Sequence, residues 1–133
     1  MKKFLRWISY AVVALLIHPK SSGAKPAHEH SPPSSCKRPW VRASYYSSRF
    51  EGKEMANGRV YHGATHTVAS RVYPLGSVLN VTARSTSRSL TVTVTDTGPW
   101  NQKFCLDLSR SAFTALGLDT KAGWGWVQIE RIA

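Results

Sequence analysis

Apolar and polar side chains alternate along two neighbouring segments in the second half of the chain. In residues 77–84, three apolar side chains beginning with Leu79 alternate with polar ones, and in residues 90–96 the apolar positions alternate with threonines. A period of two residues is typical of strands with one buried face. Residues 85–87 are Ser-Thr-Ser, which suits a tight turn. We therefore predict a β-hairpin.

Two further segments have the composition of strands, and one has that of a helix. Residues 41–46 and 124–132 are rich in β-branched and aromatic side chains. Ser109 is a good N-cap for an apolar stripe that follows it, and Gly117 is suited to end a helix of about two turns. Many short strands with one short helix predict an all-β fold, a small barrel.

The first 40 residues have a different composition. Residues 1–24 combine a basic head, a short apolar run and small residues before position 25, which predicts a secretory signal peptide. A membrane anchor is the alternative, but the run is shorter than the ~20 residues that span a bilayer. Residues 25–40 are rich in proline, serine and histidine and predict a linker. A single domain over residues 41–133 remains.

Export to the periplasm or the cell exterior changes how the two cysteines are interpreted. Cys36 and Cys105 are the only cysteines, and an oxidising compartment favours a disulfide between them, with two free thiols as the alternative. The residues before Cys36 do not form a lipidation signal, so we expect no lipid anchor and no transmembrane anchor after signal cleavage.

The chain is strongly basic, with a formal net charge of +11. Removing residues 1–24 removes four of its 18 basic and none of its 7 acidic residues, which leaves +7. Such a domain is attracted to polyanions, among them teichoic acids, acidic glycans, anionic lipids and nucleic acid. Because the charge is spread along the chain, the sequence favours general attraction over specific nucleic-acid recognition.

The segment Thr95-Asp96-Thr97-Gly98-Pro99-Trp100 is the most informative for chemistry. Asp96 occupies the next alternate position after the apolar residues of this segment, so an uninterrupted strand would point its carboxyl group inward, to the same side as those residues. Desolvation there would favour the protonated form, which glycosidic-bond cleavage needs as a proton donor. The alternative is structural, with Asp96 bonded to the backbone of its own turn.

Six short motifs follow one another along the chain. In order, they are Ala43-Ser44-Tyr45-Tyr46, Phe50-Glu51-Gly52-Lys53, Ala56-Asn57-Gly58, Pro74-Leu75-Gly76-Ser77, Asp96-Thr97-Gly98-Pro99 and Leu106-Asp107-Leu108-Ser109. Together they resemble the rare lipoprotein A family, and the resemblance covers roughly residues 42–132. It implies a six-stranded double-psi β-barrel fold, also seen in expansins and barwin-like proteins, and lytic transglycosylation of peptidoglycan, with a preference for glycan strands stripped of peptide.

The resemblance assigns roles to single residues. Asp96 falls on the family's catalytic aspartate, whereas Arg59 replaces the family's glutamate and Ser70 replaces its histidine. A lytic transglycosylase uses a hydroxyl of the sugar itself as nucleophile, so one acid/base group can serve both steps. We expect Asp96 to be that group, Ser70 to orient the hydroxyl and Arg59 to bind a carboxylate of the glycan.

Other side chains near these motifs are candidates for substrate binding. His62 and His66 lie close to the position of the missing histidine, and we expect His66 to contribute to substrate binding. The alternative is that both are loop or surface histidines without such a role. Tyr45 and Trp100 are the aromatic residues that we expect to stack on sugar rings. Asp107 is expected to be structural, near the start of the short helix.

Two hypotheses remain open from the sequence. The first is a peptidoglycan lytic transglycosylase that acts through Asp96, and the second is a binding module, for peptidoglycan or another polysaccharide, that has lost turnover or loosens walls as expansins do. We expect a monomer that acts on peptidoglycan glycan strands, with no cofactor. The sequence predicts no metal site, since His28-Glu29-His30 lies in the linker and is typical of a solvated tail.

Overall fold

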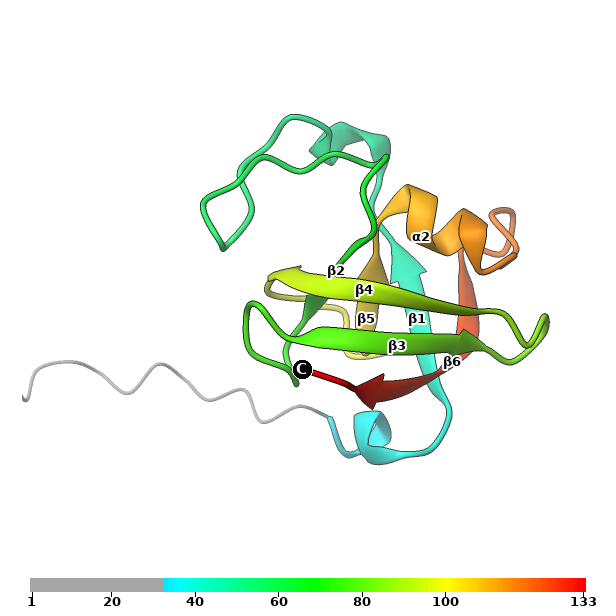
Figure 1. Cartoon of the computed structure of the whole chain (residues 1–133). Coiled ribbons are helices and arrows are strands. Elements are labelled where there is room, and N and C mark those ends of the chain that lie inside the picture. Colours follow the sequence, from blue (N-terminus) through cyan, green and yellow to red (C-terminus); the bar gives the residue numbers. More distant parts are fainter. Residues whose placement is uncertain (1–32) are drawn as a thin grey trace, which may run out of the picture. The chain divides into compact units, whose positions relative to one another are not determined.

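The structure, a computed structural model, describes residues 33–133. Within this range six strands close into a barrel in the order β1-β5-β2-β4-β3-β6 (Figure 1). The predicted all-β class, a six-stranded barrel with one short α-helix, is confirmed. The elements are η1 (Ser34–Lys37), β1 (Val41–Tyr45), η2 (Ser48–Phe50), β2 (Thr67–Ser70), β3 (Val78–Ala83), β4 (Ser89–Asp96), β5 (Leu106–Leu108), α2 (Arg110–Ala115) and β6 (Trp124–Arg131).

The predicted hairpin is formed by β3 and β4, which pair in antiparallel fashion with Leu79 opposite Val92. Both side chains are buried in the interior. Ser87 in the connecting turn has a φ of 57°, the left-handed conformation that tight hairpin turns use. The alternation along the sequence therefore predicts this hairpin and its inner face correctly.

The alternation does not reveal β2 and β5. These strands have 4 and 3 residues, and most of their side chains are buried. They are nevertheless central, because β2 pairs in parallel with β4 and β5 pairs in parallel with β1. Each parallel pair joins segments far apart in the sequence, which requires a long crossover connection.

Aliphatic side chains from the strands fill the barrel interior, and α2 covers one end of it. Ser109 caps α2 by accepting a hydrogen bond from the Ala112 N–H (3.3 Å), and Gly117 follows the helix with a φ of +71°, so both predicted helix signals are confirmed. Burying each large apolar side chain contributes roughly 1.5–3 kcal/mol. The largest fully buried apolar residues are Phe113, Leu79, Leu106, Leu108, Leu116, Val68, Val81, Val92, Val94 and Val127.

A disulfide links Cys36 to Cys105, with an S–S distance of 2.06 Å and a Cα–Cα distance of 5.5 Å. The predicted pairing is therefore present, and it attaches η1 to the barrel just before β5. The rest of the predicted linker and the predicted signal peptide, together with the histidine cluster at 28–30, lie outside the described residues. No helix between residues 33 and 133 has the length and apolar character needed to cross a membrane.

Residues 46–66 leave the barrel between β1 and β2 and form a lobe beside the end of β4 (Figure 1). The lobe has a small apolar cluster of its own, separate from the barrel interior. The members of this second cluster are Tyr46, Phe50, Met55, Tyr61 and, from β2, Ala69. The lobe is thus a folded part of the domain that packs against the outside of β2.

Candidate active site

The register of three strands brings two carboxyl groups to one face. Asp96 of β4 and Asp107 of β5 are both paired with Ala69 of β2, one from each side. Residues that pair directly across strands share a face of the sheet. Two strand spacings separate the carboxyl-bearing residues, about 10 Å between their Cα atoms, with Ala69 on the strand between them.

A β-bulge decides which way Asp96 points. The register of β2 with β4 shifts between Val68 and Ala69, so that Val68 pairs with Val94 while Ala69 pairs with Asp96. Thr95 is the additional residue, and such a residue reverses the side on which the following side chains fall. The prediction that Asp96 points inward is therefore wrong. Asp96 instead faces the lobe, as does Thr95, whose hydroxyl donates to Met55 Sδ (3.3 Å).

Three donors hold the Asp96 carboxyl group. The Tyr46 hydroxyl donates to Oδ2 at 2.6 Å, and the backbone N–H groups of Ala56 and Thr97 donate to Oδ1, each at 2.9 Å. The donors come from β1's end, from the lobe and from the residue after β4. Burial, the hydrogen bond to Asp96 and the negative charge of Asp96 together raise the pKa of Tyr46, so this hydroxyl keeps its proton and remains a donor.

Asp107 has the environment that the sequence suggested for Asp96. Burial and, to a smaller degree, the negative charge of Asp96 raise its pKa, and a hydrogen bond from the Ser44 hydroxyl to Oδ1 (3.3 Å) opposes the shift. Together these effects bring the pKa of Asp107 to about 6. A carboxyl group with such a pKa exchanges its proton close to neutral pH. Sequence reasoning treated Asp107 as structural; a polar residue alternating with Leu106 and Leu108 was the available signal.

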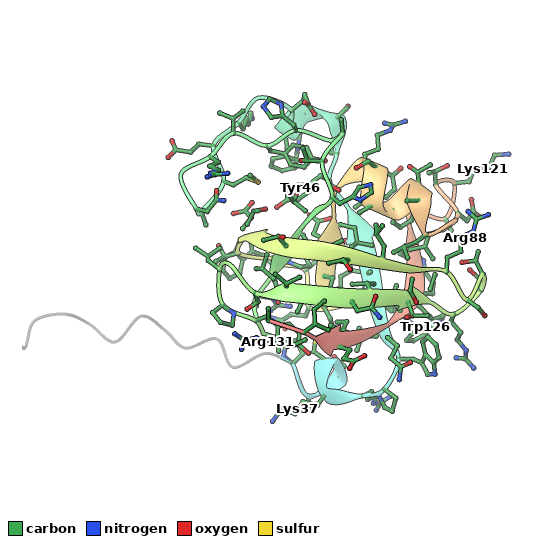
Figure 2. The ribbon with its side chains drawn as sticks, in the orientation of Figure 1. Lys37, Tyr46, Arg88, Lys121, Trp126 and Arg131 are labelled. Carbon is green, nitrogen blue, oxygen red and sulfur yellow. A yellow bond between two sulfur atoms is a disulfide. The ribbon has the colours of Figure 1, made fainter. Side chains whose placement is uncertain are left out.

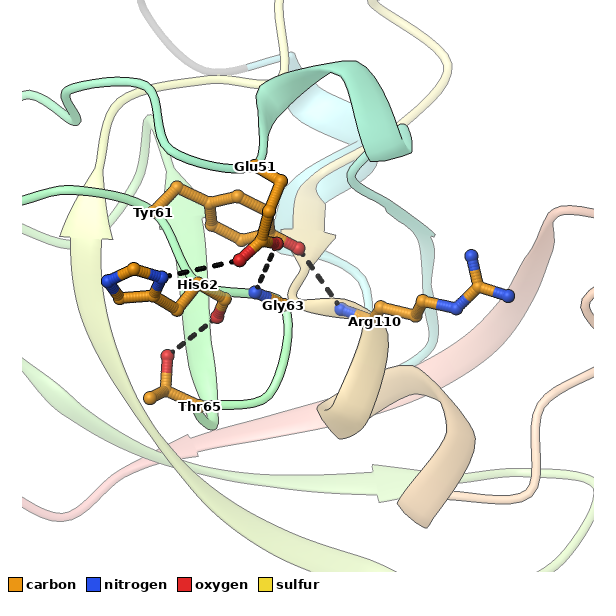
Figure 3. A network of polar contacts seen from close by, with 6 residues as sticks. All are labelled: Glu51, Tyr61, His62, Gly63, Thr65 and Arg110. Carbon is orange, nitrogen blue, oxygen red and sulfur yellow. Dashed lines mark hydrogen bonds and ion pairs between the residues drawn. The ribbon is translucent and has the colours of Figure 1, made fainter.

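Hydrogen bonds join residues within the lobe and tie the lobe to α2 (Figure 3). Glu51 accepts from the Gly63 N–H (2.8 Å) and contacts His62 Nδ1 (3.3 Å). The Gly63 hydrogen bond is the larger cause, and His62 the smaller, of a lowered Glu51 pKa. The Tyr61 hydroxyl accepts from the backbone N–H of Arg110, the first residue of α2. Exposed pairs such as Glu51–His62 contribute little stability, but the network as a whole fixes the segment that carries Ala56.

Two of the predicted substrate-binding residues lie on segments that adjoin Asp96. Trp100 follows the Asp-Thr-Gly-Pro turn and is 64% exposed, so its indole is available to a ligand. Arg59 is exposed on the loop that carries Ala56, where its N–H donates to Asn57 Oδ1 (2.9 Å). That loop is also bonded to β4, through the Asn57 N–H and the Thr95 carbonyl oxygen (3.2 Å).

The other three predicted residues make no hydrogen bond to Asp96, whose partners are Tyr46, Ala56 and Thr97. Ser70 is 2% exposed, and its hydroxyl accepts from the N–H groups of the two residues after Arg71, each at 3.0 Å. Tyr45 packs on Phe113 with ring centroids 4.4 Å apart and donates to the carbonyl oxygen of residue 120. His66 precedes β2 and is exposed. It is Tyr46, the next residue after Tyr45, that reaches Asp96, because consecutive strand residues point to opposite sides.

No group of three side chains suited to hold a metal ion occurs within residues 33–133. The candidate site is therefore a pair of carboxyl groups, with Tyr46 bonded to one of them and an exposed tryptophan nearby. We call this arrangement of Asp96, Ala69, Asp107 and Tyr46 the carboxylate face. Such a face can exchange protons with a ligand, and the exposed Trp100 can offer that ligand an aromatic surface.

Comparison with solved structures defines the class of this domain. An expansin of Clavibacter michiganensis, solved as a mutant in complex with cellohexaose, has a TM-score of 0.57 and 23% identity over 71% of this chain and 50% of its own. The same expansin without ligand has a TM-score of 0.55 and 28% identity, with the same coverage. The fold is a double-psi β-barrel, as the resemblance implied.

Comparison of sequences defines the family. The model of the family described as "Lytic transglycolase" matches residues 40–129. Proteins named endolytic peptidoglycan transglycosylase RlpA are similar to this chain, at 37% identity in Haemophilus influenzae and 36% in Pasteurella multocida, each over 68% of this chain. The chain belongs to the lytic transglycolase family. It spans about a third of the length of these relatives, since the matched regions cover 31% and 30% of them.

Proposed function

We propose that this domain cleaves the glycan strands of peptidoglycan as a lytic transglycosylase, with Asp96 as the general acid/base. The observation that carries the proposal is the pairing of Asp96 and Asp107 on one face across Ala69. The names of the related proteins support the substrate class. The exposed Trp100, close in sequence to Asp96, supplies an aromatic surface of the kind that binds sugar rings.

The proposed reaction consumes no water. Protonated Asp96 gives its proton to the glycosidic oxygen as the bond from that oxygen to the anomeric carbon breaks. The 6-hydroxyl oxygen of the same sugar bonds to the anomeric carbon, and its proton passes to the Asp96 carboxylate, which restores the acid. The products are a 1,6-anhydro sugar end and a free hydroxyl end, so one carboxyl group serves both proton transfers.

Asp107 is a positioning residue in this proposal. The negative charge of Asp96 contributes to the raised pKa of Asp107, so Asp107 retains its proton to higher pH than an isolated carboxyl group would. Tyr46 donates to Oδ2 of Asp96 and Ala56 donates to Oδ1, which orients the carboxyl group toward the position of the bond to be cleaved.

Incubation of the protein with peptide-stripped glycan strands, with products read by mass spectrometry, tests the proposal. Anhydro-ended fragments are expected from the unmodified chain and none from Asp96→Asn. Asp119→Asn is the matched control, since Asp119 is an exposed carboxylate that accepts a hydrogen bond from the Lys121 N–H; it is expected to leave the products unchanged. Equal cleavage by Asp96→Asn would contradict the assignment of Asp96.

A second candidate function is glycan binding without cleavage. It is favoured by Ser70, which stands where the family has histidine and is buried in its own turn, and by Arg59, which stands where the family has glutamate. If this function is the correct one, intact glycan will co-sediment with the unmodified chain and with Asp96→Asn alike, and no anhydro-ended product will form.

A further inference from the structure

A second surface of the barrel, on β1, β6 and the residues just before β1 and just after β3, combines three indoles with two guanidinium groups. Strand register places Arg42 opposite Trp126 and places Ser44 opposite Trp124. Figure 2 shows Trp126 across β4 and β3 from Tyr46, at a distance from the carboxylate face. We call this surface the tryptophan face, and its members are Trp40, Arg42, Arg84, Trp124 and Trp126.

The two arginines of the tryptophan face lie over aromatic rings. The Arg42 guanidinium carbon is 4.8 Å from the Trp124 ring centroid and 5.1 Å from that of Trp126. The Arg84 guanidinium carbon is 5.6 Å from the Trp40 ring centroid. Contact with an indole removes water from the flat side of a guanidinium group but leaves its N–H edge free to bind an anion in the plane.

No carboxylate forms an ion pair within 4.0 Å with these arginines in the part of the chain that the structure describes. The ion pair found there joins His62 to Glu51, in the lobe. Asp119 lines the same hollow as Arg84, and it accepts from the Lys121 N–H (2.9 Å). The guanidinium groups of the face therefore have no direct carboxylate partner, and their natural complement is an anion.

Trp126 forms a ridge between two hollows. One hollow of about 500 Å³ is lined by Arg84, Trp124 and Trp126 among others. The other, of about 240 Å³, is lined by Trp40, Arg42 and Trp126, with Arg38 and Lys103 at its side. Trp126 is 36% exposed, so its ring is available from solvent with a cationic group on each side of it.

We propose that the tryptophan face binds an acidic polysaccharide, with a sugar ring against Trp126 and the carboxylate of that sugar or its neighbour on Arg42. An aromatic ridge beside guanidinium groups suits a ligand whose rings and anionic groups lie close together. Single-stranded nucleic acid requires successive exposed ring faces for successive bases. Here Trp126 is the one indole of the three that is exposed, and Arg42 lies over two of them.

The inference goes beyond the proposed function, because binding at this face needs neither Asp96 nor cleavage. Peptide-stripped peptidoglycan strands are a suitable probe, since their muramyl sugars carry a lactyl carboxylate. A site of this kind would hold the domain on an acidic glycan while the carboxylate face acts on the same strand or on another one.

The test uses the full chain with Asp96→Asn, which prevents cleavage of the probe. Two-dimensional NMR spectra of the indole N–H groups report the two faces separately, because Trp100 lies near the carboxylate face and Trp126 on the other. Addition of the strands is expected to shift the Trp126 signal, including in a chain that also carries Trp100→Ala. A shift of the Trp100 signal alone would overturn the inference and leave the proposed function standing.

Variants then test the chemistry of recognition, with affinity taken from titration of the Trp126 signal. Arg42→Gln is expected to weaken binding about ten-fold. Methyl esterification of the strands is expected to weaken binding to the same extent. Because both changes remove the same contact, esterified strands should bind the Arg42→Gln variant no more weakly than native strands do. Arg131→Gln, a matched change at the far end of β6, is expected to have no effect. Trp126→Phe, which keeps an aromatic ring and the fold, is read through the Trp124 signal and is expected to retain most of the affinity.

Two results would overturn the inference at this stage. Equal affinity for native and esterified strands would exclude carboxylate recognition by Arg42. Tighter binding of an oligothymidylate than of the strands, measured in the same buffer and with a steep dependence on salt, would make the tryptophan face a nucleic-acid site instead.

Discussion

The carboxylate face and the tryptophan face use the same barrel in opposite ways. At the carboxylate face, the charged groups are partly removed from water and receive hydrogen bonds from Tyr46, Ser44 and backbone N–H groups. At the tryptophan face, the charged groups are cations that lie on aromatic rings and keep free N–H edges. The first arrangement suits proton transfer and the second suits binding, so changes at one face should leave the other unaffected.

The largest expected separation of the two faces comes from Asp96→Asn. We expect this change to lower the rate of glycan cleavage by about 10²–10⁴-fold, the usual contribution of a general acid/base, without changing affinity at the tryptophan face. Initial rates of anhydro-end formation and indole NMR titrations measure the two effects. A loss of affinity at Trp126 together with the rate would mean that the faces are not independent.

Removal of the disulfide should affect the tryptophan face more than the carboxylate face. Cys105 and Ser35 line the smaller hollow beside Trp126, and the 69-residue separation of the cysteines makes the cross-link worth about 4 kcal/mol in the chain-entropy estimate. Cys36→Ser with Cys105→Ser is expected to lower the free energy of unfolding by about that amount in urea titrations. At low temperature, cleavage activity is expected to persist while affinity at Trp126 falls. An unchanged midpoint of urea unfolding would contradict the stabilisation assigned to the disulfide.

Asp107→Asn should separate stability from activity at the carboxylate face. The folded-state pKa of Asp107, about 6, is above its ordinary value of 3.8, so its contribution to stability is complete below about pH 4 and is lost as the pH rises through 6. We expect Asp107→Asn to raise the free energy of unfolding by about 2–3 kcal/mol at pH 7 and to have little effect at pH 4, with reduced cleavage. Urea titrations at both pH values check this, and a stability gain at pH 4 alone would contradict the sign.

Tyr46→Phe is the smallest change and keeps the ring in the second cluster. Loss of the 2.6 Å hydrogen bond to Asp96 removes about 1.5–3 kcal/mol of interaction with a charged group. We expect a roughly ten-fold lower rate with an altered pH profile and no change at the tryptophan face. Tyr45→Phe is the matched control, since the Tyr45 hydroxyl bonds to the backbone far from Asp96; an equal effect of both changes would show that only packing is involved.

Much of the barrel was predictable from local pattern. The alternation in β3 and β4, the strand composition of β1 and β6, and the capping residues of α2 each depend on side chains within a few positions of one another. Asp96 and Trp100 were identified as candidates because a distinctive turn follows the strand. These signals survive in the structure because each element buries the face that its own sequence marks as apolar.

The remaining features depend on pairing between distant segments. The short strands β2 and β5 bury most of their side chains only because β4 and β1 lie alongside them. With 4 residues in β2 and 3 in β5, these strands are too short to show an alternation that would predict their burial. Whether Tyr45 or Tyr46 contacts Asp96 depends on the side of the sheet to which each side chain points. The end of β1 and the path of the lobe determine that side. The sequence pattern favoured Tyr45 as a sugar-stacking residue and gave no sign that its neighbour Tyr46 bonds to Asp96.

The sequence by itself determined the class of fold, the hairpin, the helix, the cysteine pair and the identity of Asp96 as a candidate. Only the tertiary structure decided that Asp96 turns outward, that Asp107 faces it across Ala69, and that Arg42 lies over two indoles. The physical reason is that a side chain's direction in a sheet follows from strand register, and one bulged residue at Thr95 reverses it. Register is a property of two chain segments together, so neither segment alone contains it.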